Sequence, residues 1–96
     1  MPRRRYIVSY DIADPKRLRQ VAKTVEGFGR RLQFSVFECP LDPTRLEKLK
    51  AKLQSILNRD HDQILFIDLG SNTTQNGLRI DALGMPYRQK TQLTIV

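Results

Sequence analysis

The sequence predicts a small α/β or α+β domain in which two helices cover one face of a single sheet. Extended apolar segments alternate along the chain with two segments whose apolar residues recur at helical spacing. The length of 96 residues allows one domain, and no low-complexity run or long linker divides it. We therefore expect residues 1–96 to form one domain with one core.

The first strand and the first helix are expected before residue 30. Residues 5–10 are short, aromatic and β-branched, which is typical of a buried strand. Asp14 and Pro15 then supply a helix N-cap and a proline at the first helical position. Gly29 is expected to end this helix, whose outer face is basic. Its core stripe consists of Leu18, Val21, Ala22, Val25 and Phe28.

Residues 30–38 form an extended segment that Pro40 is expected to end. As a single strand, this segment gives a βαβαβ order with parallel crossovers. A kink near residues 33–35 would instead give two short antiparallel strands and a ferredoxin-like βαββαβ sandwich. Periodicity slightly favours the single strand and leaves both topologies open.

The second half of the chain again combines a helix with a strand. Asp42 and Pro43 predict a capped helix start, and residues 64–69 form the most hydrophobic strand. Two short extended pieces, at 78–83 and 91–95, are expected after a polar loop. The second helix has a core stripe of Leu46, Leu49, Leu53, Ile56 and Leu57 and a solvent face of Lys48, Lys50 and Lys52.

The chain carries a net charge of +7, and most of the excess lies in its first third. Residues 1–31 contain nine basic and three acidic side chains, and most of these cations are arginines. The planar fork of arginine suits phosphate oxygens, so a basic face on a small domain favours a polyanion partner, most simply nucleic acid. A basic surface without a partner is the alternative on this feature alone.

The sequence favours a cytoplasmic protein over a membrane or secreted one. No stretch approaches the roughly 20 apolar residues of a spanning helix, and the basic N-terminus lacks the apolar region of a signal peptide. The single cysteine, Cys39, can form neither a disulfide framework nor a zinc site on its own. We expect a reduced compartment and a small core that benefits from a partner subunit.

Asp11 is the main candidate for chemistry, because it lies at the carboxyl end of the first strand, just before a basic helix. A carboxylate among arginines suits a site where Mg²⁺ and phosphate meet, since Mg²⁺ binds through one or two carboxylates, substrate phosphates and water. One aspartate makes a poor site, whereas a twofold axis would bring two copies together. The alternative is an aspartate that hydrogen-bonds its own turn.

The other titratable candidates have simpler interpretations. His61 and its neighbours Asp60 and Asp62 are expected to be solvated residues of a charged turn. Cys39 is expected to be small and buried, because no constellation for nucleophilic work surrounds it in the sequence. Asp68 lies inside a hydrophobic strand, where it can flank a sheet edge or pair with an arginine.

The aromatic residues of the extended segment do not predict base stacking. Phe34 and Phe37 follow two arginines, but the glycine and aromatic alternation of an RNA-recognition sheet is missing. We therefore expect both phenylalanines to pack in the core. The sequence also lacks a phosphate-cradling glycine loop, a zinc spacing and a Ser/His/Asp pattern.

Two motifs resemble one known family. Residues 6–12 (Tyr-Ile-Val-Ser-Tyr-Asp-Ile), followed by Asp14 and a basic helix, resemble the opening of the CRISPR-associated protein two family, the small adaptation nuclease. Residues 29–38 (Gly-Arg-Arg-Leu-Gln-Phe-Ser-Val-Phe-Glu) resemble its second motif. The resemblance implies the kinked, ferredoxin-like α+β topology with an extra C-terminal strand. It also implies homodimers and metal-dependent cleavage of RNA or double-stranded DNA, in partnership with the CRISPR integrase during spacer acquisition.

The resemblance also implies roles for individual residues. Asp11 matches the family's metal-binding aspartate, one from each subunit, with one Mg²⁺ shared across the dimer axis. The strand around residues 91–96 resembles the segment that pairs with the neighbouring subunit's sheet, as an exposed edge strand can. The positions expected near the catalytic site are Tyr10, Arg31, Ser35 and Phe37. The arginines expected to bind nucleic acid are Arg17, Arg19, Arg30 and Arg31.

The leading hypothesis is therefore a dimeric, Mg²⁺-dependent endonuclease of CRISPR adaptation. In this hypothesis the paired Asp11 carboxylates hold the metal, metal-bound water attacks phosphorus, and basic residues hold the phosphates. A non-catalytic scaffold that clamps duplex DNA for the integrase is the first rival. A toxin-like ribonuclease of the same fold is the second.

Overall fold

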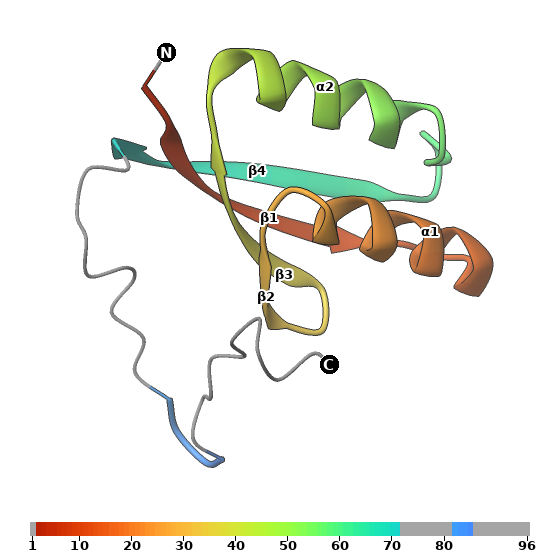
Figure 1. Cartoon of the computed structure of the whole chain (residues 1–96). Helices are drawn as coiled ribbons and strands as arrows, with labels where there is room; N and C mark the ends of the chain where they lie inside the picture. The colour runs from red at the N-terminus through yellow and green to blue at the C-terminus, as the bar shows by residue number, and fades with distance from the viewer. Residues whose placement is uncertain (1, 72–81, 86–96) are drawn as a thin grey trace, which may run out of the picture.

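The protein is a ferredoxin-like sandwich in which two helices pack on the same side of a four-stranded sheet (Figure 1). The computed structural model describes residues 2–71 and 82–85. The elements, in chain order, are β1 (Arg4–Asp11), α1 (Pro15–Glu26), β2 (Arg30–Gln33), β3 (Val36–Leu41), α2 (Pro43–Gln54) and β4 (Gln63–Ser71). This order confirms the βαββαβ topology that the family resemblance implies. The extra strand expected at 91–96 lies outside the described residues.

The sheet has the strand order β2-β3-β1-β4, and every neighbouring pair is antiparallel. The single strand favoured by periodicity over residues 30–38 is therefore wrong, because Phe34 and Ser35 form a turn between β2 and β3. The expected end at Pro40 is also wrong, since β3 continues to Leu41 and pairs Pro40 with Arg5 of β1. Pro40 lies beyond the last residue of β3 that pairs with β2, so its missing amide does not interrupt that ladder.

Both helices begin as the sequence predicts. The side chain of Asp14 accepts a hydrogen bond from the Arg17 amide (2.9 Å), and that of Asp42 accepts one from the Arg45 amide (2.8 Å). The next residue in each case is a proline, which has no amide to satisfy at this position. None of the described helices is long and apolar enough to cross a membrane.

The core lies between the helices and one face of the sheet. Leu18 was expected in this core but is 38% exposed, so the apolar stripe of α1 is narrower than its spacing indicates. Lys50 and Lys52 do not simply face solvent, because their ammonium groups lie over the rings of Phe66 and Phe28. Among the described residues, the buried hydrophobic ones are Val8, Tyr10, Val21, Val25, Phe37, Cys39, Leu41, Leu49 and Leu53.

Gly29 does not end α1, as the sequence predicted, because the helix stops at Glu26 and Gly27 is its C-cap. Gly29 is instead the point where the chain passes closest to β3. A Cβ atom at this position would overlap the carbonyl oxygen of Glu38 and lie 2.8 Å from the Cα atom of Cys39. Only glycine permits this approach, since two of the three nearest atoms belong to the backbone of β3 and the third is the buried Sγ of Cys39.

We predict that Gly29→Ala lowers the free energy of unfolding by about 3 kcal/mol, because the added methyl group forces β3 away from its place in the sheet. Gly27→Ala is the matched control, since its Cβ atom would meet nothing closer than the Thr24 carbonyl oxygen at 3.4 Å. We expect that control to change stability by less than about 1 kcal/mol. Urea unfolding of the two variants tests this difference, and equal losses would contradict the close-packing account.

Candidate active site

Asp11 lies on the face of the sheet that the helices do not cover. Successive residues of β1 point to opposite faces, and Val8 and Tyr10 are buried against the helices. Asp11 therefore points to the other face, where it is exposed at the carboxyl end of β1. In the β1–β4 ladder, Asp11 is paired with Gln63. We call this side of the sheet, which neither described helix covers, the open face.

The open face carries apolar side chains further along β4, beyond Gln63, the polar residue paired with Asp11. Ile67 and Leu65 of β4 are paired with Ile7 and Ser9 of β1, so these side chains share a face with Asp11. Leu65, Ile67 and Leu69 are 47%, 45% and 48% exposed. Apolar side chains adjoining one another on a sheet face are typical of a surface that another protein covers.

A single chain does not complete a metal site among its described residues. Within residues 2–71 and 82–85, no three His, Cys, Asp or Glu side chains gather closely enough to hold a metal ion. Asp11 offers one exposed carboxylate, the kind of ligand that Mg²⁺ takes, together with water and phosphate oxygens. One carboxylate is a sparse donor set for Mg²⁺, although it is of the kind that Mg²⁺ accepts.

Tyr10 fixes the β2–β3 turn beside Asp11. The Tyr10 amide donates a hydrogen bond to the Ser35 carbonyl oxygen (3.0 Å), and the Tyr10 hydroxyl donates one to the Phe34 carbonyl oxygen (3.1 Å). Burial raises the pKa of Tyr10, and the nearby Arg31 partly offsets this effect. The phenol is therefore a protonated donor that holds the turn. The contact of Ser35 is with Tyr10, the residue before Asp11, and it is made by the Ser35 backbone.

Phe37 and Arg31 lie on the helix side of the sheet, opposite the open face. The Phe37 ring is fully buried and stacks on Tyr10, with 6.1 Å between the ring centroids. The Arg31 guanidinium covers the same ring at 5.1 Å and lies 3.8 Å from Glu26 of α1. Phe37 therefore has no surface for a ligand, and within one chain Arg31 and Asp11 point to opposite faces.

Phe34 is not a core residue, as was expected, whereas Phe37 is. The Phe34 side chain is 89% exposed, because it occupies the turn between β2 and β3. Hydrophobicity alone does not distinguish the two phenylalanines; the kink in the segment decides which one faces inward.

Two of the four arginines expected to bind nucleic acid are held in close ion pairs. Arg30 lies 2.6 Å from the buried carboxylate of Glu38, which also lies 3.0 Å from Arg5. Arg17 is paired with Asp62 at 2.8 Å. Arg19 is exposed on α1 and makes no ion pair with any of the described residues. The sequence analysis missed Glu38, whose two cations come from different strands.

Asp62 is not a solvated loop residue, although its neighbours Asp60 and His61 are exposed as expected. Its side chain has no exposed surface and accepts hydrogen bonds from Arg17 and from two backbone amides. These bonds hold the pKa of Asp62 well below its ordinary value, and the Arg17 guanidinium has the largest effect. No local signal marks this role, because Arg17 is 45 positions away in the sequence.

The remaining titratable candidates are structural. Asp68 forms an ion pair with Arg4 (2.9 Å), which is one of the two possibilities open for it from the sequence. Cys39 is buried as expected, and burial raises the pKa of its thiol to about 12. A thiol with such a pKa stays protonated at neutral pH and is no nucleophile.

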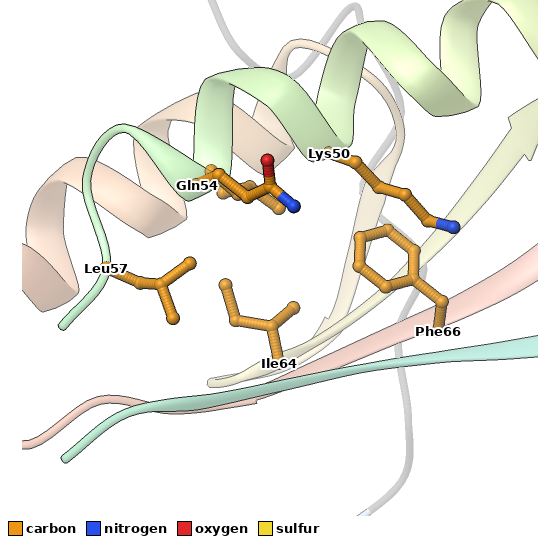
Figure 2. A pocket seen from close by; sticks show the side chains of 6 residues that line it. Lys50, Gln54, Leu57, Ile64 and Phe66 are labelled. Carbon is orange, nitrogen blue, oxygen red and sulfur yellow. The ribbon is translucent and has the colours of Figure 1, made fainter. Parts of the chain in front are cut away.

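A hollow of about 310 Å³ lies between α2 and β4, on the helix side of the sheet (Figure 2). Lys50 and Phe66 both line this hollow, and the Lys50 ammonium lies over the Phe66 ring, 5.6 Å from the ring centroid. The hollow and Asp11 are therefore on opposite faces of the sheet, and the hollow adds nothing to the candidate site. Its lining residues are Lys50, Leu53, Gln54, Leu57, Ile64 and Phe66.

A comparison with known protein families finds a match over most of the chain. The family model described as "CRISPR associated protein Cas2" matches residues 4–76, a range that includes all six described helices and strands up to residue 71. The chain belongs to the Cas2 family. The match begins with β1 and so includes Asp11 and the β2–β3 turn.

Individual relatives and solved structures are similar over most of the chain. A protein of Rhodospirillum rubrum named CRISPR-associated endoribonuclease Cas2 1 is 44% identical over 82 residues, which cover 85% of this chain and 79% of the relative. The CRISPR-associated endoribonuclease Cas2 of Geobacter sulfurreducens is 49% identical over 65 residues, or 68% of each chain. The crystal structure of Streptococcus pyogenes Cas2 at pH 6.5 has a TM-score of 0.71 at 38% identity, covering 83% of this chain and 99% of that one. A hypothetical protein from Thermus thermophilus has a TM-score of 0.74 at 30% identity, covering 92% and 99%.

We predict that the stabilising contribution of Asp62 disappears in acid. Because its pKa is depressed in the folded state, the carboxylate stabilises the fold above its unfolded pKa of about 4 and loses this contribution as the pH falls below it. The difference in unfolding free energy between the wild type and Asp62→Asn should therefore be large at pH 7 and smaller at pH 3. Urea unfolding at both pH values measures it.

Asp60→Asn is the matched control for this measurement, because it makes the same change at an exposed position in the same loop. It should alter stability little at either pH. An Asp62→Asn difference that stays constant with pH would contradict the assigned ion pair.

Proposed function

We propose that this chain is a Mg²⁺-dependent endonuclease of CRISPR adaptation that acts in the cytoplasm, as a homodimer, on RNA or duplex DNA. Its membership of the Cas2 family and the names of its relatives, endoribonuclease and endonuclease, support a nuclease. The observation that carries the proposal is the position of Asp11, exposed beside the apolar open face. A carboxylate in that place becomes half of a two-carboxylate site when a second copy covers the face.

The apolar side chains of β4 on the open face support a homodimer. Leu65 and Ile67 together leave a substantial apolar surface in water, which a partner of matching character would cover. In a twofold dimer the same patch is used by both subunits, so every residue near the axis meets its own copy. Asp11 lies at the end of this patch, and its copy would approach it from the partner subunit.

In the proposed reaction, Asp11, Tyr10 and Arg19 have different roles. Asp11 holds the cation, and Tyr10 holds the turn next to it through its hydroxyl and amide. Arg19 is available to bind backbone phosphates, because its side chain is exposed on α1. Bound Mg²⁺ supplies charge stabilisation at the phosphodiester and an acidified water, so that no side chain is needed as a general base.

A scaffold without catalysis is the second candidate, and the charge of the chain favours it. A net charge of +7 on 96 residues doubles in a dimer, which favours contact with the phosphates of duplex DNA in a complex with an integrase. In that role Asp11 would be dispensable, whereas it is essential to the nuclease. Both candidates include partnership with the CRISPR integrase.

We predict that Asp11→Asn lowers the rate of Mg²⁺-dependent cleavage at least about a hundredfold, since charge stabilisation of the transition state is lost. Binding of the same oligonucleotide should persist, because Asp11 contributes no positive charge. Cleavage of labelled RNA and duplex DNA, with and without a chelator, measures the first effect, and fluorescence anisotropy measures the second.

Asp60→Asn serves as the control, because it removes a carboxylate from an exposed loop and should leave cleavage unchanged. Cleavage that survives the loss of Asp11 or the removal of metal would contradict the nuclease. An inactive wild type whose Asp11→Asn variant still supports spacer acquisition would establish the scaffold instead.

We further predict that Leu65→Asp converts the dimer into monomers. The introduced carboxylate would be buried without a partner when a second copy covers the open face, and burial of an unpaired charge is costly. Light scattering at micromolar concentration measures the mass. Leu18→Asp is the control, since Leu18 is a similarly exposed leucine on α1, away from the open face. A monomeric wild type, or a Leu65→Asp variant that remains dimeric, would exclude the open face as the dimer interface.

A further inference from the structure

One buried carboxylate fastens the loop after Asp11 to the loop before β4. Asp62 Oδ1 accepts a hydrogen bond from the Ala13 amide (2.9 Å), and Oδ2 accepts one from the Asn58 amide (2.8 Å). Arg17 donates from Nε to Oδ2 (2.8 Å) and from Nη2 to Oδ1 (3.1 Å). Both carboxylate oxygens are thus engaged twice, without exposure to solvent.

These contacts bear directly on the position of Asp11. Ala13 is two residues beyond Asp11, so its bond to Asp62 fixes the path of the chain where it leaves β1. Asp62 itself immediately precedes Gln63, the β4 residue paired with Asp11. The backbone of Asp11 is therefore held both along its own strand and across the ladder by groups that converge on Asp62.

Arg17 is committed to the same arrangement by its backbone and its side chain. Its amide donates to the N-cap Asp14 (2.9 Å), and its guanidinium forms the bidentate pair with Asp62. The positive charge of Arg17 is balanced at close range by a buried negative charge. Arg19, two positions further along the same helix, is exposed and has no such partner among the described residues.

We propose that Arg17 and Asp62 form a positioning pair that holds the Asp11 loop in its metal-binding geometry, and that Arg17 does not act as a phosphate anchor. Arg19 serves as the anchor on this helix. The proposal rests on the proposed role of Asp11. It assigns different roles to Arg17 and Arg19, which the sequence analysis expected to bind nucleic acid in the same way. A shift of about 1 Å in a catalytic group can cost two orders of magnitude in rate, so such a pair has a measurable effect.

The test compares Arg17→Gln and Asp62→Asn with Arg19→Gln as the matched control. Each change in the pair should lower kcat about tenfold or more and leave KM nearly unchanged, because phosphate binding is untouched. The double variant should lose no more than the worse single one, since both act through one contact. Arg19→Gln should instead weaken binding and lower the salt dependence of oligonucleotide affinity by about one counterion.

Two readouts do not require cleavage and so separate this proposal from the proposed function. Hydrogen exchange at the Ala13 amide should accelerate at least tenfold in Asp62→Asn, while exchange in β3 stays unchanged. The salt dependence of DNA affinity for Arg17→Gln should equal that of the wild type. If the wild type cleaves nothing, the proposed function fails. These two measurements still test whether Arg17 and Asp62 hold the Asp11 loop in place.

A fall in salt dependence for Arg17→Gln equal to that for Arg19→Gln would overturn the proposal, as would an Ala13 amide that exchanges equally fast in both proteins. Should Asp62→Asn or Arg17→Gln fail to fold, Arg17→Lys replaces them, because it keeps the charge and loses the two-pronged geometry. If Arg17 is a positioning residue, Arg17→Lys should lower kcat and leave the salt dependence unchanged. If Arg17 is a phosphate anchor, the variant should keep both the kcat and the salt dependence of the wild type.

Discussion

The alternation of side chains along β1 is the constraint on which the rest of the structure depends. Tyr10 enters the core, where it stacks on Phe37 and bonds to the β2–β3 turn. The next residue, Asp11, must then face away from the helices, since successive side chains of a strand point to opposite faces. Burial of an aromatic ring thus fixes the direction of the carboxylate, and a register slip of one residue would exchange the two.

The charge of the protein is distributed differently from what its composition indicates. Glu38 lies between Arg5 and Arg30, and Asp62 is paired with Arg17, so several cations of the first third are balanced locally. Desolvation offsets much of the attraction within a buried pair, whereas removal of one partner alone leaves an uncompensated buried charge. Exposed side chains such as Arg19 therefore carry the charge that the proposed binding of a polyanion requires.

Local features of this fold could be predicted from the sequence, and long-range ones could not. The caps at Asp14 and Asp42 and the core positions of Val21 and Leu49 depend on neighbours within a few residues. The burial of Asp62 depends on a guanidinium far away in the chain. The role of Gly29 depends likewise on a strand that packs against it. The sequence pattern left a kink near residues 33–35 open, and only the family resemblance decided for it, because periodicity does not register a two-residue turn inside an apolar run.

In the proposed dimer, two copies of Asp11 share one cation across a twofold axis. The most direct measurement is a titration of the protein with Mn²⁺ under electron paramagnetic resonance, which counts bound and free ions without requiring catalysis. The account predicts one bound ion for every two chains in the presence of an oligonucleotide, and its loss in Asp11→Asn. One ion for each chain, or a bound ion that persists in Asp11→Asn, would contradict it.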